Sequence, residues 1–181
     1  MRSFVALMLP EAVREALEAL QDELPVGRAL DPEGLHVTLA FLGDQPRLAL
    51  EALDAELAAI RQAPIPLELA GLDVWGGARP RSLVALVRPD PALTRLHKAV
   101  RAAAGRAGME LERVRFRPHV TLARFGRLDE EQCAKLGRFL SARGGAALPG
   151  FTARDFSLMR STLTPEGAFY DSLADYPLEA A

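Results

Sequence analysis

The sequence of 181 residues contains a single cysteine, Cys133, and carries a net charge of only −2 at pH 7. One cysteine excludes an internal disulfide framework and a thiolate zinc cluster, and it fits a reducing compartment. The small net charge argues against a protein that coats nucleic acid non-specifically, but it leaves room for a local basic site. No apolar run approaches the length of a membrane-spanning helix. We therefore expect a cytoplasmic protein that does not insert into membranes.

The first residues do not resemble a targeting segment. The apolar run from Phe4 to Leu9 is too short for a signal peptide, and charge resumes at Glu11. This run is typical of a buried first strand that ends at Pro10. With 49% hydrophobic residues over this length, we expect one domain, residues 1–181, with a sizeable core.

Helical periodicity predicts four amphipathic helices, the first of which starts after Pro10. The fourth begins after Asp129, a good N-cap with Gln132 three residues later, and should bury Cys133 on its apolar face. A third helical stretch contains His97, which we expect at the surface. The apolar positions of the first three helices are Val13, Leu17, Leu20 and Leu24; Leu50, Leu53, Leu57 and Ile60; and Leu93, Leu96 and Val100.

Strand-like segments fill the gaps, and their order repeats. Residues 1–90 run helix, histidine strand, helix and two strands, and residues 91–181 do the same. No linker rich in Pro, Gly or Ser separates the halves. We therefore expect an α+β fold of mainly antiparallel sheet with flanking helices. Its two lobes should be related by a pseudo-two-fold axis, with a cleft between them.

Each half contains one copy of an octet, "HVTLAFLG" at 36–43 and "HVTLARFG" at 119–126, and six of the eight positions agree. In a strand, residues i and i+2 point to the same face. Strict alternation therefore places a histidine, a threonine and an alanine on one face of each copy, and apolar side chains on the core face. The first face is expected to hold His36, Thr38, Ala40, His119, Thr121 and Ala123, and the core face Val37, Leu39, Phe41, Val120 and Leu122.

Pseudo-symmetry would bring the two imidazoles together in the cleft. Histidine titrates near neutrality, so one ring can accept a proton from a nucleophile while the other donates a proton to a leaving oxygen. Threonine hydroxyls can donate to the non-bridging oxygens of a phosphate. Two histidines without a third ligand do not make a zinc site, and we expect no metal.

Arginines around the second octet favour a phosphate substrate. The segment "RVRFRPHVTLARFGR" holds Arg113, Arg115, Arg117, Arg124 and Arg127 without an acidic residue. Alternation puts Arg117 on the His119 face. It puts Arg124 on the opposite face, unless the strand bulges before it. The pattern of Arg113, Arg115 and Arg127 is also consistent with a solvated surface.

The paired H-x-T motifs, the second within "RPHVTLAR", closely resemble those of the two-histidine phosphoesterases. Within that superfamily the chain is similar to RNA 2′,3′-cyclic phosphodiesterases, also called 2′-5′ RNA ligases. The resemblance extends from "SFVALMLP" through "GLHVTLAFLG" to "STLTPEGAFYDSLADYPL". It implies a bilobal fold, no cofactor, and hydrolysis of a terminal 2′,3′-cyclic phosphate on RNA to a 2′-phosphate. The family's name also records the joining of tRNA halves through a 2′-5′ bond.

The resemblance also implies roles for individual residues. His36 and His119 become the acid–base pair, for which we assign His119 as the base and His36 as the acid; Thr38 and Thr121 become phosphate clamps. Arg124 matches the arginine that ends the second motif, and Phe4 matches an aromatic that can stack on a base. Met8 departs from the family pattern, since relatives often place a polar residue there.

Two other functions remain open from the sequence. The substrate could be a small cyclic phosphate in place of RNA, or the protein could be a non-catalytic binder of RNA ends, although two intact H-x-T motifs speak against the latter. We expect a monomer. Four further residues of the two hairpins could reach the cleft but are given low weight: Arg79, Arg81, Ser161 and Tyr170.

Overall fold

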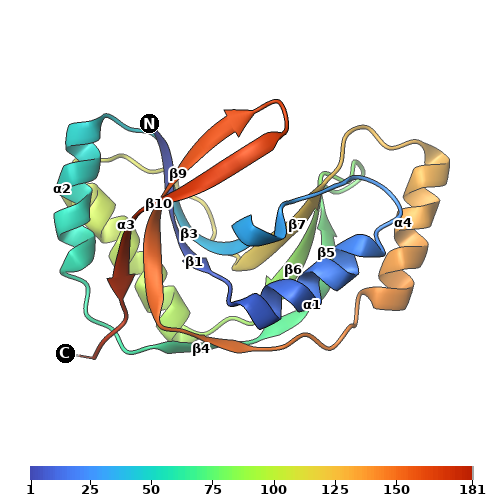
Figure 1. Ribbon diagram of the computed structural model, residues 1–181, viewed down its shortest axis with the longest axis horizontal. Coiled ribbons are helices and arrows are strands. Elements are labelled where there is room, and N and C mark those ends of the chain that lie inside the picture. The colour runs from blue at the N-terminus through green and yellow to red at the C-terminus, as the bar shows by residue number, and fades with distance from the viewer. Residues whose placement is uncertain (181) are drawn as a thin grey trace.

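The computed structural model describes residues 1–180 and places four helices where the periodicity predicts them (Figure 1). The predicted capping box forms, because Asp129 Oδ1 accepts the Gln132 amide at 2.8 Å and Gln132 Oε1 accepts the Asp129 amide at 3.0 Å. Asp90 caps another helix start by accepting the Ala92 amide at 2.7 Å. No helix in residues 1–180 is long and apolar enough to cross a membrane. The helices are α1 (Glu11–Asp22), α2 (Arg47–Ala58), α3 (Pro91–Arg106) and α4 (Glu130–Arg143).

The described chain forms one large antiparallel sheet and one strand pair, which confirms the predicted α+β class. The large sheet has the order β10-β9-β1-β3-β7-β6-β5, with the short β2 also paired to β7, and β4 pairs with β8. A 3-10 turn, Pro32–Gly34, precedes the first histidine strand. The strands are β1 (Arg2–Met8), β2 (Arg28–Ala29), β3 (His36–Asp44), β4 (Ile65–Leu67), β5 (Leu69–Trp75), β6 (Ser82–Val87), β7 (His119–Arg124), β8 (Phe151–Ala153), β9 (Asp155–Thr164) and β10 (Gly167–Pro177).

The two lobes exchange hairpins. In one group β3 pairs with β1, which pairs with β9 of the C-terminal hairpin β9–β10; in the other, β7 pairs with β6 of the hairpin β5–β6. We call these groups the His36 lobe and the His119 lobe. The helices cross over too, since α3 packs on β3 while α1 packs on β7. Figure 1 shows the lobes side by side, with the β9–β10 hairpin rising above the middle. Each lobe therefore draws strands from both halves of the sequence, and the division into 1–90 and 91–181 stays a prediction.

Both histidine strands carry a β-bulge at the same position of the octet. Across from β3, Val5 pairs with Ala40 and Ala6 with Thr38, so Leu39 is the extra residue. Across from β7, Leu122 is the extra residue in the same way. Two successive side chains of each strand therefore point into the core, and alternation reverses beyond them.

Strict alternation was consequently wrong at three positions. Ala40 and Ala123 are buried in the core and do not line the cleft, whereas Phe41 is 66% exposed. The reversal also turns Arg124, which holds the place of Phe41 in the second octet, to the His119 face. The bulge that would bring Arg124 to that face is thus present.

A polar side chain from a helix of the opposite half lies against the carbonyl of each bulge residue, and the Leu122 carbonyl also accepts the backbone amide of Leu30 at 2.9 Å. Nδ1 of His97 on α3 lies 2.7 Å from the carbonyl oxygen of Leu39. Gln21 Nε2 on α1 donates to the carbonyl oxygen of Leu122 at 2.8 Å. The expectation that His97 lies at the surface was wrong. Its side chain is only 8% exposed and stacks on Phe116, with ring centroids 3.9 Å apart.

Cys133 is exposed, contrary to the expectation that it is buried. The core-facing residues of α4 are Leu136 and Phe139, in the later turns of the helix. Cys133 belongs to the first turn, which lies outside this contact, so its position on the apolar stripe does not bury it.

We expect His97→Leu to lower the free energy of unfolding by about 1–3 kcal/mol, because the Leu39 carbonyl would remain buried without a donor. Urea denaturation at pH 7.5 measures this difference. The matched control is Lys98→Leu on the exposed face of the same turn, which should change stability by less than about 0.5 kcal/mol. Equal stability of His97→Leu and wild type would contradict the structural role of this hydrogen bond.

The pH dependence of stability should also report His97. Burial lowers its pKa; the hydrogen bond to Leu39 opposes this shift, and the charges of Arg101 and Lys98 add to it. Between the folded pKa and the unfolded value of about 6.5, the unfolded chain binds more protons. The free energy of unfolding of wild type should therefore fall as the pH drops below about 6.5. Denaturation at pH 7.5 and 5.5 should show a smaller fall for His97→Leu, and an equal fall would refute the shift.

Candidate active site

Both catalytic candidates are held by the same local hydrogen bond. Nδ1 of His36 lies 2.7 Å from the carbonyl oxygen of Gly34, and Nδ1 of His119 lies 2.6 Å from the carbonyl oxygen of Arg117. A carbonyl oxygen only accepts, so Nδ1 carries a proton in both rings. Nε2 is therefore the nitrogen that gains or loses a proton, and it is free for a ligand in both motifs.

A single contact between β3 and β7 brings the two motifs together. The strands are antiparallel and pair only through Val37 and Val120, whose side chains face the core. Their neighbours on the opposite face are the motif residues. In antiparallel register, His36 lies beside Thr121, and Thr38 lies beside His119. Each imidazole thus has the hydroxyl of the other motif next to it.

Aromatic rings surround His36. Phe4 stacks on it at a centroid distance of 4.7 Å, and Tyr170 meets it edge-on at 5.3 Å. Phe4 is only 3% exposed, so its ring supports His36 and leaves no open face on which a base could stack. Tyr170, a low-weight candidate in the sequence analysis, comes from the hairpin of the other half and closes this side of the site.

Trp75 takes the corresponding place beside His119. Its ring lies 4.2 Å from the imidazole, and the guanidinium of Arg117 lies 4.2 Å above the indole. Its Nε1 donates to Asp73 at 3.0 Å, which fixes the orientation of the ring. Sequence analysis did not select Trp75. The signal was available in the repeated architecture, because Trp75 ends the strand before the hairpin turn of the first half.

The pKa values of both histidines are lowered from their ordinary value. For His36 the main cause is burial, opposed by the hydrogen bond to Gly34 and reinforced by repulsion from His119. For His119 the main cause is again burial, opposed by its hydrogen bond and reinforced by the charges of Arg124 and Arg117. Both rings are therefore neutral at pH 7 in the free protein.

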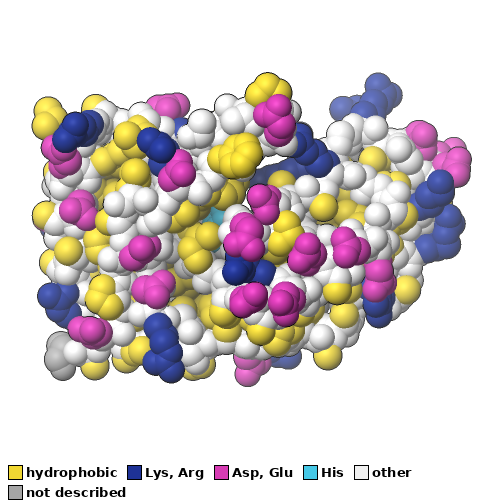
Figure 2. All heavy atoms as spheres, viewed as in Figure 1, with side chains coloured by type: hydrophobic (Ala, Val, Ile, Leu, Met, Phe, Trp, Pro, Cys, Tyr) yellow, Lys and Arg dark blue, Asp and Glu magenta, His cyan; other side chains and the backbone are white. Residues whose placement is uncertain are grey.

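The two sides of the site differ in chemistry although their backbones correspond. Phe41 pairs with Phe4 on one side, and Arg124 pairs with Ser82 on the other. Figure 2 shows the face hollowed beneath the β9–β10 hairpin, with apolar side chains on one side of the hollow and Lys or Arg side chains on the other. The site thus combines an apolar end with a cationic end.

The remaining candidates lie around this centre. Ser161 pairs with Tyr170 in the β9–β10 hairpin and is half-buried, while Arg79 and Arg81 are exposed in the turn after Trp75. Arg113, Arg115 and Arg127 are also exposed. These six residues stay secondary candidates.

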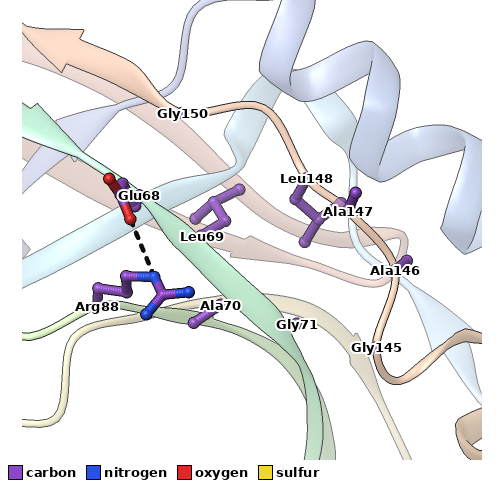
Figure 3. Close-up of a pocket in the computed structure, with 10 residues that line it drawn as sticks. All are labelled: Glu68, Leu69, Ala70, Gly71, Arg88, Gly145, Ala146, Ala147, Leu148 and Gly150. Atoms are coloured by element: carbon purple, nitrogen blue, oxygen red, sulfur yellow. Dashed lines mark ion pairs between the residues drawn. The ribbon is translucent and has the colours of Figure 1, made fainter.

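A second pocket lies apart from the histidines, between β5 and residues 145–150 (Figure 3). Its two charged side chains are paired with each other, with Arg88 Nε 2.9 Å from Glu68 Oε2. None of the predicted site residues lines it. Within residues 1–180, no group of three or more His, Cys, Asp or Glu is arranged to hold a metal ion. The lining residues are Glu68, Leu69, Ala70, Gly71, Arg88, Gly145, Ala146, Ala147, Leu148 and Gly150.

Known proteins are similar to this chain in both sequence and fold. An RNA 2′,3′-cyclic phosphodiesterase of Thermus thermophilus is 33% identical over 98% of this chain and 90% of its own length. Another from Archaeoglobus fulgidus is 29% identical over 96% of this chain and 98% of its own length. The crystal structure of Escherichia coli LigT in the apo form superposes with a TM-score of 0.77 at 25% identity, covering 98% of this chain and 97% of that one.

The family comparison covers most of the molecule. The model of the 2′-5′ RNA ligase superfamily matches residues 9–162, which include both H-x-T motifs and Trp75. The chain therefore belongs to the 2′-5′ RNA ligase superfamily, as its paired motifs predicted.

Proposed function

We propose that the protein is an RNA 2′,3′-cyclic phosphodiesterase that hydrolyses a terminal cyclic phosphate to a 2′-phosphate. The observation that carries this proposal is the pair of imidazoles, each with Nδ1 bound to a carbonyl and Nε2 free. Relatives that match nearly the whole chain carry that name. The apolar end of the site suits a base, and the cationic end suits a phosphate.

The reaction requires that one proton be removed from the attacking water and that one proton be donated to the leaving oxygen. Nε2 of His119 takes a proton from water as the water oxygen attacks phosphorus. The bond between phosphorus and the 3′-oxygen breaks, and Nε2 of His36 donates its proton to that oxygen. Burial, together with the charges of Arg124 and Arg117, lowers the pKa of His119, which favours the neutral ring and supports its role as the base. Bound phosphate is an anion and raises the pKa of His36, so that this ring enters the reaction protonated.

The hydroxyls and Arg124 stabilise the charge of the phosphate. Thr38 and Thr121 flank the histidines and are half-buried, so each can donate to a non-bridging oxygen. Arg124 lies on the same face beyond the bulge and can donate two hydrogen bonds through its planar guanidinium. Arg117 contributes through its charge while its guanidinium stays on Trp75.

The same site can join RNA ends. If the 5′-hydroxyl of a second RNA replaces water as the nucleophile, loss of the 3′-oxygen leaves a 2′-5′ phosphodiester. The same two proton transfers serve this step. We propose this as a second reaction, with tRNA fragments among its substrates.

We further propose that the protein acts as a monomer in the cytoplasm. Both histidines, both threonines and both aromatic walls come from one chain, so that no second copy is needed to complete the site. The exposed thiol of Cys133 fits a reducing compartment.

His36→Ala and His119→Ala should each reduce turnover by about 10²–10⁴-fold, because each removes one proton-transfer group. The assay uses a short RNA ending in a 2′,3′-cyclic phosphate, in EDTA and without ATP, and identifies the position of the product phosphate. Arg138→Gln, an exposed change on α4, is the control and should retain full activity. A 3′-phosphate product, or activity in either histidine variant close to that of wild type, would refute the mechanism.

The pH–rate profile should be bell-shaped, with its maximum on the acid side. The reaction needs one neutral and one protonated ring, and both pKa values lie below about 6.5 in the free enzyme. The maximum of kcat/KM should therefore fall below about pH 6.5. The maximum of kcat should lie at higher pH, because bound phosphate raises both pKa values. A kcat/KM plateau extending to high pH would contradict a protonated histidine as the acid.

A further inference from the structure

Two arginines face each other at the mouth of the site. Arg28 in β2 pairs directly with Arg124 in β7. Residues directly opposite on antiparallel strands point to the same face, so that Arg28 shares the cleft face of Arg124. Sequence analysis did not select Arg28, because it lies outside the motifs and in a strand of two residues.

The position of β2 places Arg28 in the opening between the lobes. The other side of β7 is taken by β6, where Ser82 pairs with Arg124. Hence β2 lies on the side of β7 from which β3 diverges after its single contact at Val37. An RNA strand whose end is bound at the histidine pair passes the Arg28 side chain if it leaves through this opening.

The guanidinium of Arg28 extends toward the β9–β10 hairpin. A Cβ built on Gly167, at the start of β10, would lie 3.0 Å from an Arg28 terminal nitrogen. The side chain therefore projects over the opening and does not lie flat on its own lobe. Neither Arg28 nor Arg124 forms an ion pair with an acidic group of residues 1–180.

Like charges placed directly opposite on neighbouring strands destabilise a sheet. An anion between them removes this repulsion, and two phosphates can engage both arginines. Arg124 shares the His119 face of β7 beyond the bulge, so its guanidinium can reach the reacting phosphate. Arg28 lies one strand farther out, in the opening.

We propose that Arg28 binds the phosphodiester on the 5′ side of the terminal nucleotide. The contact makes the enzyme prefer an oligonucleotide end to a cyclic mononucleotide, which lacks that phosphate. This inference rests on the proposed cyclic phosphodiesterase function, and it makes Arg28 a specificity residue of the same site.

The test compares two substrates that differ by the 5′ phosphodiester. One is 2′,3′-cyclic AMP, and the other is a short oligoadenylate ending in a 2′,3′-cyclic phosphate. Arg28→Gln should lower kcat/KM for the oligonucleotide about tenfold, the effect of one lost charge-assisted hydrogen bond, and leave the mononucleotide unchanged. For Arg28→Gln acting on the oligonucleotide, the slope of log kcat/KM against log salt concentration should be less steep than that of wild type by about 0.7. Arg28→Lys keeps the charge and should retain most of that slope.

Arg138→Gln on α4 removes the same charge far from the opening and should change neither substrate. Equal losses on both substrates would show that Arg28 serves the reacting phosphate or the fold, and would overturn the proposal. No loss on the oligonucleotide would overturn it as well.

Binding without turnover separates this proposal from the proposed function. An oligoadenylate ending in a 2′-phosphate should bind Arg28→Gln about tenfold more weakly than wild type, whereas adenosine 2′-phosphate should bind both equally. If wild type fails to hydrolyse either cyclic substrate, the phosphodiesterase proposal fails. The binding comparison then still decides whether Arg28 holds the second phosphate.

Discussion

Each histidine strand carries an extra residue at the fourth position of its octet, Leu39 in β3 and Leu122 in β7, and the direction of the side chains that follow depends on that residue. Without the bulge, alternation would bury Arg124 and place a methyl group of Ala123 in the cleft. With it, two apolar side chains in succession anchor the strand in the core, and the next side chain turns outward beside the histidine. Side chains from two helices bond to the extra residues, His97 to the Leu39 carbonyl and Gln21 to the Leu122 carbonyl, which also accepts the Leu30 amide. Two helix positions away from the H-x-T motifs thereby support the cleft face.

Symmetry of the backbone and asymmetry of the side chains have separate functions here. The shared backbone gives both imidazoles the same tautomer and the same exposed nitrogen, so that either ring is built to exchange a proton at Nε2. The side chains at the sixth position of the octets then make the two ends of the site different, with the apolar Phe41 at one end and the cationic Arg124 at the other. A nucleotide is itself divided in this way, with an apolar base at one end and anionic oxygens at the other. The polarity of the site therefore matches that of a nucleotide.

Periodicity and motif spacing predicted the helices, the succession of helices and strands along the chain, and the shared face of His and Thr in each motif, because these depend on local sequence. The predictions from sequence failed where a single inserted residue reverses the alternation of side chains along the strand, since nothing in "HVTLA" distinguishes a bulge from regular alternation. It also failed for His97, Trp75 and Tyr170, whose positions depend on contacts between distant segments. Trp75 lies against the histidine of the second half, and Tyr170 against that of the first. Only the exchange of hairpins between lobes explains those contacts.

The exchanged hairpins have a consequence for folding of the protein during synthesis. When the ribosome has made both H-x-T motifs, the chain still lacks β9 and β10, which cover the open edge of β1 and supply Tyr170 against His36. Of the two rings packed on that histidine, only Phe4 precedes the motifs in the chain. The edge of β1 therefore stays unpaired until β9 has been made, whereas β5 and β6 are ready before β7. An unpaired edge strand is a template for pairing with other chains, so the order of synthesis leaves the His36 lobe open to aggregation for longer than the His119 lobe.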